Sequence, residues 1–200
     1  MEKYKNMKVL EIDGRNSKPY DEIYEFVNHF AKVKLGKTYG FINEQGEEIV
    51  EPKYDFVYDF KDGFAMVRHN SKVGLVDEKG KKVIDTKYDY IGEFENGLAI
   101  VFIDRFKGSQ LNYGLVNKQG EEIVGLKYDN ISPFVNGMAR VIAKKKYGFI
   151  NAQGKEIVPI KYNAADDFEE NGLARVYMFD GCNVTKYYVN KDGEEFPFTE

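Results

Sequence analysis

The residues that could carry acid–base chemistry form a trio, Lys-Tyr-Asp, that stands at residues 53–55, 87–89 and 127–129. A lysine, a phenol and a carboxylate side by side could exchange protons with a substrate. However, a feature that recurs in copy after copy of a motif serves every copy, so its simplest role is architectural. We therefore interpret each trio as a buried ring between a solvated lysine and an aspartate that caps a turn.

Other candidates for catalysis or metal binding lack the necessary spacing. The two side chains of Glu47-Glu48 point to opposite faces of a strand, so they cannot act on one substrate atom. Segments 77–80 and 190–193 vaguely resemble calcium loops but lack a ligand at every second position and a distal bidentate glutamate. Cys182, the single cysteine, has no base at a recognisable spacing. We expect no enzymatic activity, no metal site and no cofactor.

Two segments hold residues that the other copies of the motif do not repeat. They are the links 101–113 and 176–187, which are longer than the other links and richer in aromatic and charged residues. The simplest interpretation is a pair of longer hairpins whose extra residues pack on each other, and the alternative is a binding role. The candidate binding residues are of types frequent at interface hot spots or on adaptable surfaces: Arg105, Phe106, Tyr177, Met178 and Phe179.

The links separate copies of one repeat. The full copies are expected at 39–72, 73–112, 113–146 and 147–186, within a single array that spans residues 1–200. Residues 1–38 contain a degenerate first copy, in which His29 replaces a motif glycine. Residues 187–200 contain a partial last copy, in which Tyr188 replaces the glycine of the first strand. Atypical end copies are expected of capped repeat arrays.

Turn chemistry divides each copy into three short strands. In the first full copy, residues 39–43, 47–50 and 64–68 are expected to be strands, and 53–60 a short irregular segment. The repeated strand glycines, such as Gly114, mark the close approach of a neighbouring backbone or ring. No window has a sustained helical period. We predict an all-β fold, a tandem array of three-stranded antiparallel β units, which is solenoid-like or superhelical; a propeller-like ring is the alternative.

The repeat resembles the WG-repeat family of bacterial proteins. The resemblance rests on Tyr-Gly-Phe-Ile-Asn at residues 39–43, on the later Gly, Ile-Val and Lys-Tyr-Asp, and on Asn-Gly-Leu-Ala, and it covers about residues 20–196. The tryptophan that names the family is replaced in this chain, by Tyr39, Val73, Tyr113, Tyr147 and Tyr187. The resemblance implies a non-catalytic module for interactions, without a defined ligand.

Composition limits the partners. The formal net charge of −4 disfavours nucleic acid, which needs a concentrated basic surface. No apolar stretch is long enough to span a bilayer, and the first residues lack the pattern of a signal peptide, so the default location is cytoplasmic.

We expect a binding module whose partner is most simply another protein, bound by the repeat surface and the long hairpins. The alternative is carbohydrate or cell-envelope binding through exposed tyrosines. Tyrosines clustered along one face would favour sugar, whereas mixed Arg, Phe and Met patches would favour protein. The sequence specifies neither the partner nor the oligomeric state.

Overall fold

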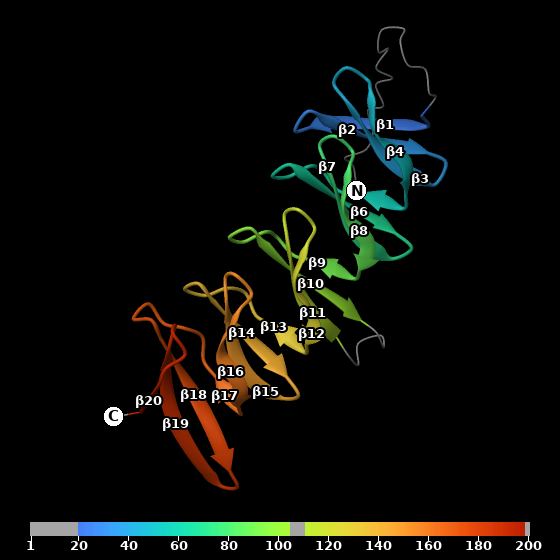
Figure 1. The fold of residues 1–200 in the computed structure, drawn as a ribbon. Helices are drawn as coiled ribbons and strands as arrows, with labels where there is room; N and C mark the ends of the chain where they lie inside the picture. Colours follow the sequence, from blue (N-terminus) through green and yellow to red (C-terminus); the bar gives the residue numbers. More distant parts are fainter. Residues whose placement is uncertain (1–19, 105–110, 199–200) are drawn as a thin grey trace, which may run out of the picture. The chain divides into compact units, whose positions relative to one another are not determined.

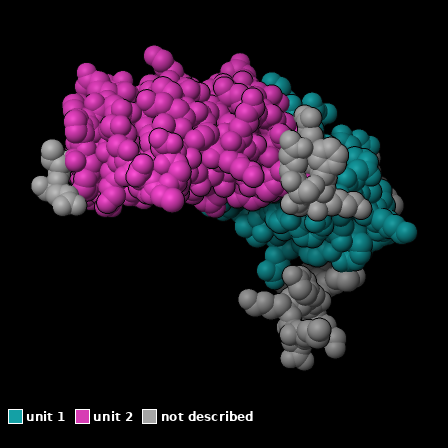
Figure 2. Space-filling view, turned by 90° about the horizontal axis from the view of Figure 1, so that it is seen from below, with its two compact units in different colours: residues 1–89 teal, residues 90–200 magenta. Residues whose placement is uncertain are grey.

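The computed structural model describes residues 20–104 and 111–198, and all regular structure within them is β-strand, as expected (Figure 1). The chain divides into two compact units, residues 1–89 and 90–200 (Figure 2). The first unit contains β1 (Glu22–Val27), β2 (Phe30–Leu35), β3 (Thr38–Asn43), β4 (Glu48–Tyr54), β5 (Phe56–Val57), β6 (Phe64–His69), β7 (Lys72–Asp77) and β8 (Lys82–Tyr88). The second contains β9 (Tyr90–Ile91), β10 (Leu98–Asp104), β11 (Leu111–Asn117), β12 (Glu122–Tyr128), β13 (Asn130–Ile131), β14 (Met138–Ala143), β15 (Lys146–Asn151), β16 (Glu156–Tyr162), β17 (Ala164–Ala165), β18 (Leu173–Asp180), β19 (Asn183–Asn190) and β20 (Glu195–Pro197).

Within the described residues the strands form five four-stranded antiparallel sheets, which we call A to E in chain order. The first unit holds sheet A (β1 to β4) and sheet B (β5 to β8). The second holds sheet C (β9 to β12), sheet D (β13 to β16) and sheet E (β17 to β20). Strands that are neighbours in each sheet are also neighbours in sequence, so every connection is a short local one.

The expected three-stranded unit is wrong, because each sheet has a fourth strand. Residues 56–57 lie in the segment expected to be irregular, yet as β5 they pair with β6, Val57 opposite Val67. Between β4 and β5 the chain leaves sheet A for sheet B, at Asp55, whose N–H donates to the Arg68 carbonyl at 2.8 Å. Each sheet therefore combines the second half of one sequence repeat with the first half of the next.

One Asn or Asp side chain closes the turn between the third and fourth strands of every sheet. In sheet A, Oδ1 of Asn43 accepts hydrogen bonds from the N–H groups of Gln45 at 3.1 Å and Glu47 at 2.9 Å. Sheets B to E repeat this pair of bonds at Asp77, Asn117, Asn151 and Asn190. The segments that vaguely resemble calcium loops are therefore turns, held by side chains that bind their own backbone.

The cores lie between successive sheets of each unit. Neighbouring residues of a strand point to opposite faces, so a central strand buries both faces: in β3, Phe41 packs toward sheet B and Ile42 packs on the other side. The core between sheets A and B contains Phe41, Val50, Tyr54, Val57, Phe60, Ala65, Val67 and Val76. Equivalent cores lie between sheets C and D and between sheets D and E. Full burial of one such large apolar side chain stabilises the fold by about 1.5–3 kcal/mol.

The strand glycines allow a bulge against the next strand. A Cβ on Gly148 would lie 2.6 Å from the carbonyl oxygen of Val158, and the pairing of β15 with β16 shifts register at this point. In the last copy, the prediction that Tyr188 replaces the strand glycine is wrong. Val176 of β18 faces Tyr187, as Val141 faces Gly148 in sheet D, so Tyr187 rather than Tyr188 takes the glycine position. The pairing of β19 with β20 has no register shift, and a side chain therefore fits there.

Candidate functional site

The Lys-Tyr-Asp trios have the architectural role that their repetition indicated. The rings of Tyr54, Tyr88 and Tyr128 are buried. The ammonium of Lys127 lies over the Tyr128 ring, 5.0 Å from its centre. The carboxylate of Asp129 accepts a hydrogen bond from the N–H of Lys144 at 2.7 Å and so caps the turn between β14 and β15. Asp55 caps the turn between β6 and β7 in the same way.

The second long link is an extension of one hairpin. Strands β18 and β19 continue their pairing to Asp180 opposite Asn183, and Cys182 is exposed in the turn. Met178 packs partly against the core between sheets D and E, whereas the Phe179 side chain is 50% exposed. Arg105 and Phe106, the candidates from the first long link, lie outside the described residues. A binding role for these residues stays a prediction.

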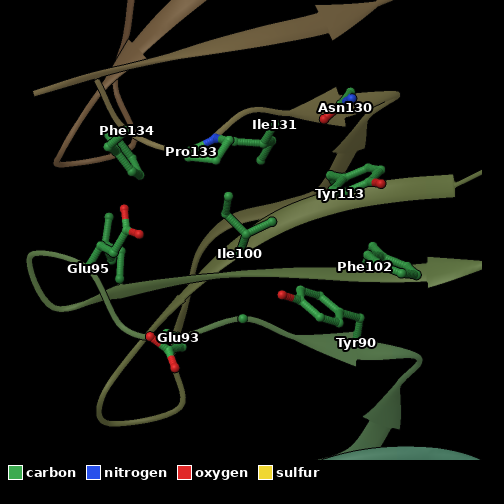
Figure 3. Close-up of a pocket in the computed structure, with 12 residues that line it drawn as sticks. Tyr90, Glu93, Glu95, Ile100, Phe102, Tyr113, Asn130, Ile131, Pro133 and Phe134 are labelled. Carbon is green, nitrogen blue, oxygen red and sulfur yellow. The ribbon is translucent and has the colours of Figure 1, made fainter. Parts of the chain in front are cut away.

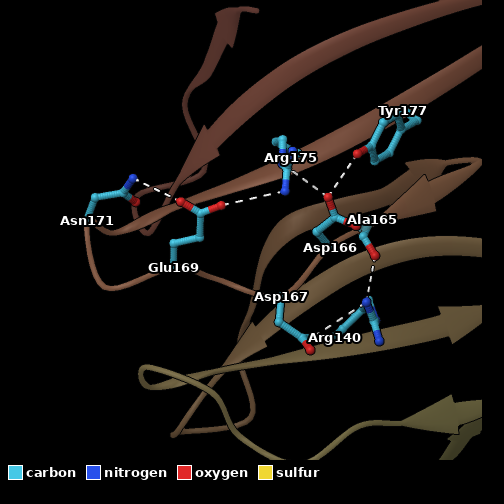
Figure 4. A network of polar contacts seen from close by, with 8 residues as sticks. All are labelled: Arg140, Ala165, Asp166, Asp167, Glu169, Asn171, Arg175 and Tyr177. Carbon is cyan, nitrogen blue, oxygen red and sulfur yellow. Dashed lines mark hydrogen bonds and ion pairs between the residues drawn. The ribbon is translucent and has the colours of Figure 1, made fainter.

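Tyr177, another of the predicted binding residues, belongs to a polar network of sheet E (Figure 4). Its hydroxyl donates a hydrogen bond to the Asp166 carboxylate at 2.8 Å, and this bond, together with burial, raises the pKa of Tyr177. Nε of Arg175 lies 3.2 Å from the same carboxylate, and Nη2 of Arg175 lies 3.7 Å from Glu169. The network therefore holds an arginine of β18 between two carboxylates of the preceding loop.

A second arginine links sheets D and E. Nη1 of Arg140, on β14, donates a hydrogen bond to the Ala165 carbonyl at 2.6 Å and lies 3.5 Å from the Asp167 carboxylate (Figure 4). Sheets A and B are linked at the same repeat position, where Lys32 of β2 lies 2.8 Å from Asp59. A basic side chain on the second strand of one sheet thus bridges to the loop of the next.

Between sheets C and D the corresponding space is a pocket of about 300 Å³ (Figure 3). Sheet C supplies one wall, with Tyr90, Ile100, Phe102 and Tyr113. The short strand of sheet D and the loop after it supply the other, with Asn130, Ile131, Pro133 and Phe134. The carboxylates of Glu93 and Glu95 come from the loop between β9 and β10. The pocket is therefore apolar and aromatic, with acidic groups on one side.

An aromatic row across three strands forms part of this wall. Tyr90 of β9 pairs with Phe102 of β10, and Phe102 pairs with Tyr113 of β11. The first two rings are stacked, with centres 5.2 Å apart and planes 16° apart, and the centres of the second and third are 5.1 Å apart. Tyr90 is 47% exposed. A planar or apolar group could pack on this row.

The pocket lies where three positions of the repeat differ from their counterparts in sheet D or sheet E. Ile100 faces Leu115, as Arg140 faces Phe149, so it replaces the bridging arginine. The N–H of Gly92 donates to the Ile100 carbonyl, as the N–H of Asp166 donates to the Arg175 carbonyl. Gly92 therefore takes the repeat position of Asp166, and sheet C has no carboxylate there. On the opposite wall, Pro133 takes the position that Asp167 occupies in sheet E. Each of the two follows a loop residue whose N–H donates to a carbonyl of the second strand of its own sheet.

The site predicted from the sequence lies in the links between copies and does not include this pocket. The signal was present within the copies: at one repeat position Arg140 and Arg175 are replaced by Ile100, and at another Asp166 is replaced by Gly92. The wall also includes Phe102 and Tyr113, which lie at the two ends of the first long link, 101–113. A single substitution at a repeated position can therefore indicate a candidate site as well as additional residues between repeats can.

Residues 20–104 and 111–198 contain no group of three or more His, Cys, Asp or Glu side chains that could hold a metal ion. Over the same ranges there is no helix of the length and apolar character required to cross a membrane.

Comparison with known proteins places the repeat in a family. The WG-containing repeat matches residues 39–72, 74–105, 113–147 and 147–178. No curated protein matches the sequence. A eukaryotic initiation factor is similar in structure with a TM-score of 0.44 and 10% identity, over 88% of this chain and 54% of that chain. Hsv2 of Kluyveromyces lactis has a TM-score of 0.37 and 12% identity, over 84% and 59%. This chain thus spans little more than half the length of either structure.

Proposed function

Because this chain belongs to the WG-containing repeat family, we propose that it is a non-enzymatic binding module and that its partner is another protein. The observation that carries the proposal is the pocket between sheets C and D. Its size is at the lower end of the range for ligand sites, which suits a single side chain of a partner better than a large cofactor. Ile100, Ile131 and Pro133 offer the apolar contacts that such an anchor residue uses.

The extended hairpin of sheet E supports the same function. Phe179 and Val184 face each other across β18 and β19 and are 50% and 55% exposed. Exposed aromatic and apolar side chains on a regular hairpin are suited to contact with a protein surface. The hairpin would add contact area to an interface anchored at the pocket.

Carbohydrate binding is the second candidate, and the aromatic row favours it. Tyr90, stacked on Phe102 and followed by Tyr113, is a cluster of rings on one face, on which a sugar ring could pack. The amide of Asn130 and the carboxylate of Glu95 could then bind hydroxyl groups. A sugar would use the same pocket, so one set of variants tests both candidates.

The test compares Tyr90→Ala with Tyr58→Ala, a tyrosine of the first unit that is 43% exposed. Proteins captured from native lysate by the unaltered chain are identified and purified, and their affinities for both variants are measured. We expect Tyr90→Ala to weaken binding by about tenfold or more and Tyr58→Ala to leave it unchanged. A purified partner that binds Tyr90→Ala normally would overturn the proposed site. Binding to a glycan array that depends on Tyr90 would establish the second candidate instead.

A further inference from the structure

The repeat itself shows which chemical group fits the pocket between sheets C and D. The position of Ile100 is occupied by Lys32 in sheet A, Met66 in sheet B, Arg140 in sheet D and Arg175 in sheet E. In sheets A, D and E, therefore, a long basic side chain lies on this part of the sheet. Each of these side chains forms an ion pair with a neighbouring loop.

Sheet C retains acceptors that hold an arginine elsewhere in the array. The N–H of Glu95 donates to the Leu98 carbonyl, and the N–H of Glu169 donates to the Leu173 carbonyl. The two glutamates therefore occupy the same position of the repeat. Glu169 pairs with the guanidinium of Arg175, but the residue of sheet C that corresponds to this arginine is Ile100. Glu95 is exposed and lines the pocket, and its carboxylate forms no ion pair within the described residues.

The opposite wall repeats one contact of a different arginine, Arg140, which bridges sheets D and E. Ile131 pairs with Val141, as Ala165 pairs with Val176, so Ile131 and Ala165 occupy the same position of the repeat. The Ala165 carbonyl accepts a hydrogen bond from Arg140, and the Ile131 carbonyl is its counterpart in sheet D. On the wall formed by sheet C, the stacked rings of Tyr90 and Phe102 offer a flat aromatic surface. A guanidinium is planar, packs on aromatic faces and donates to carboxylates and carbonyls at the same time.

We propose that the pocket takes an arginine side chain of the partner protein. The partner's guanidinium would pair with Glu95, donate to the Ile131 carbonyl and pack against Tyr90, and its aliphatic stem would lie on Ile100. The partner's guanidinium would thus combine the glutamate contact of Arg175 with the carbonyl contact of Arg140. This inference rests on the proposed function and specifies the partner's chemistry.

The first experiment uses small probes. N-acetyl-arginine methylamide is titrated into the full chain, and amide shifts are followed by NMR, with the citrulline analogue as the neutral isostere and the lysine analogue as the other cation. We expect saturable shifts at Gly92, Ile100 and Ile131 with the arginine probe and none with citrulline. Equal or tighter binding of the lysine or citrulline analogue would overturn the assignment to a guanidinium.

Two matched variants locate the probe. Glu95→Gln should weaken binding of the arginine probe by about tenfold, because a charge-assisted hydrogen bond is lost. Glu169→Gln, the equivalent change in sheet E, should leave it unchanged, since that carboxylate already binds Arg175. Equal effects of the two changes would overturn the site. Ile100→Arg should fill the pocket and abolish probe binding; if this variant does not fold, the glutamate pair decides.

A competition experiment separates this inference from the proposed function. The purified partner is displaced with the arginine probe and, separately, its binding to Tyr90→Ala is measured. A partner that requires Tyr90 but is not displaced by arginine keeps the proposed function and overturns the arginine assignment. If the arginine probe binds but the partner binds Tyr90→Ala with unchanged affinity, the proposed function is overturned. The partner is then also excluded as the source of the arginine.

Discussion

The side-chain amide of Asn136 donates a hydrogen bond of 2.7 Å to the carbonyl oxygen of Phe168 and thereby joins sheet D to the loop of sheet E. Asn28 makes the same 2.7 Å bond to the Phe60 carbonyl between sheets A and B. Both asparagines have positive φ angles, near 50°, in the two-residue turn that leads into the second strand. One residue therefore sets the shape of a turn and also connects it to the next sheet.

Substitution of Asn136 should separate these two roles. Asn136→Gly keeps the left-handed turn but removes the bridging bond, so we expect a loss of about 0.5–1.5 kcal/mol in the free energy of unfolding. Asn136→Ala should be about 1–2 kcal/mol less stable than Asn136→Gly, because glycine has no Cβ to oppose this φ and alanine lacks the local hydrogen bonds with which an asparagine side chain supports it. Denaturant titration measures both. If the two variants are equally stable, the turn conformation carries no such penalty.

Strand glycines should tolerate substitution only away from the bulge. A Cβ on Gly114 would lie 2.5 Å from the Val124 carbonyl oxygen, whereas a Cβ on Gly125 meets no atom within 4 Å. Gly114→Ala should therefore destabilise the chain by about 1–3 kcal/mol. Gly125→Ala should be neutral or slightly stabilising. Gly108, in the first long link, lies outside the described residues, so Gly125 serves as the control. Equal denaturation midpoints would refute the close contact.

The turn at Asp77 should depend on its side-chain oxygen and not on a metal. Asp77→Asn recreates the turn found at Asn43 and should leave stability unchanged within about 0.5 kcal/mol. Asp77→Ala removes the acceptor for Lys79 and Lys81 and should cost about 1–3 kcal/mol. A chelator should not change the melting temperature of the unaltered chain. A fall of several degrees would show that a metal stabilises the fold.

Acid should weaken the contact between sheets D and E. The Tyr162 hydroxyl donates to Glu195 at 2.6 Å, and this bond, with Lys161 nearby, lowers the pKa of Glu195. The resulting stabilisation is present above the pKa of an unfolded glutamate, about 4.3, and is lost as the pH falls through the lower folded value.

Glu195→Gln should therefore be less stable than the unaltered chain at pH 6, and the difference should shrink toward pH 3. Tyr162→Phe should reduce the same pH dependence, because it removes the largest cause of the lowered pKa. Unfolding curves recorded at each pH measure both effects. A difference between Glu195→Gln and the unaltered chain that stays constant from pH 6 to pH 3 would contradict this assignment.

The sequence by itself determined the elements that local chemistry controls. Asn43 and Gly46 specify a turn because an Asx side chain binds the backbone two and four residues ahead, and five copies repeat these bonds. Gly40 and Gly114 indicated close backbone contacts for a similarly local reason. Repetition also identified the Lys-Tyr-Asp trios as structural, because no single function would need all of them.

Only the tertiary structure decided how these elements group into sheets and where a site forms. Two residues such as Phe56–Val57 carry too little pattern to predict a strand, and they become one because β6 and the core between sheets A and B hold them there. The pocket depends on Ile100, Gly92 and Pro133, which come from two different sheets. None of the three is unusual alone. Their effect appears when packing brings them together at the position where other sheets are bridged by a basic side chain.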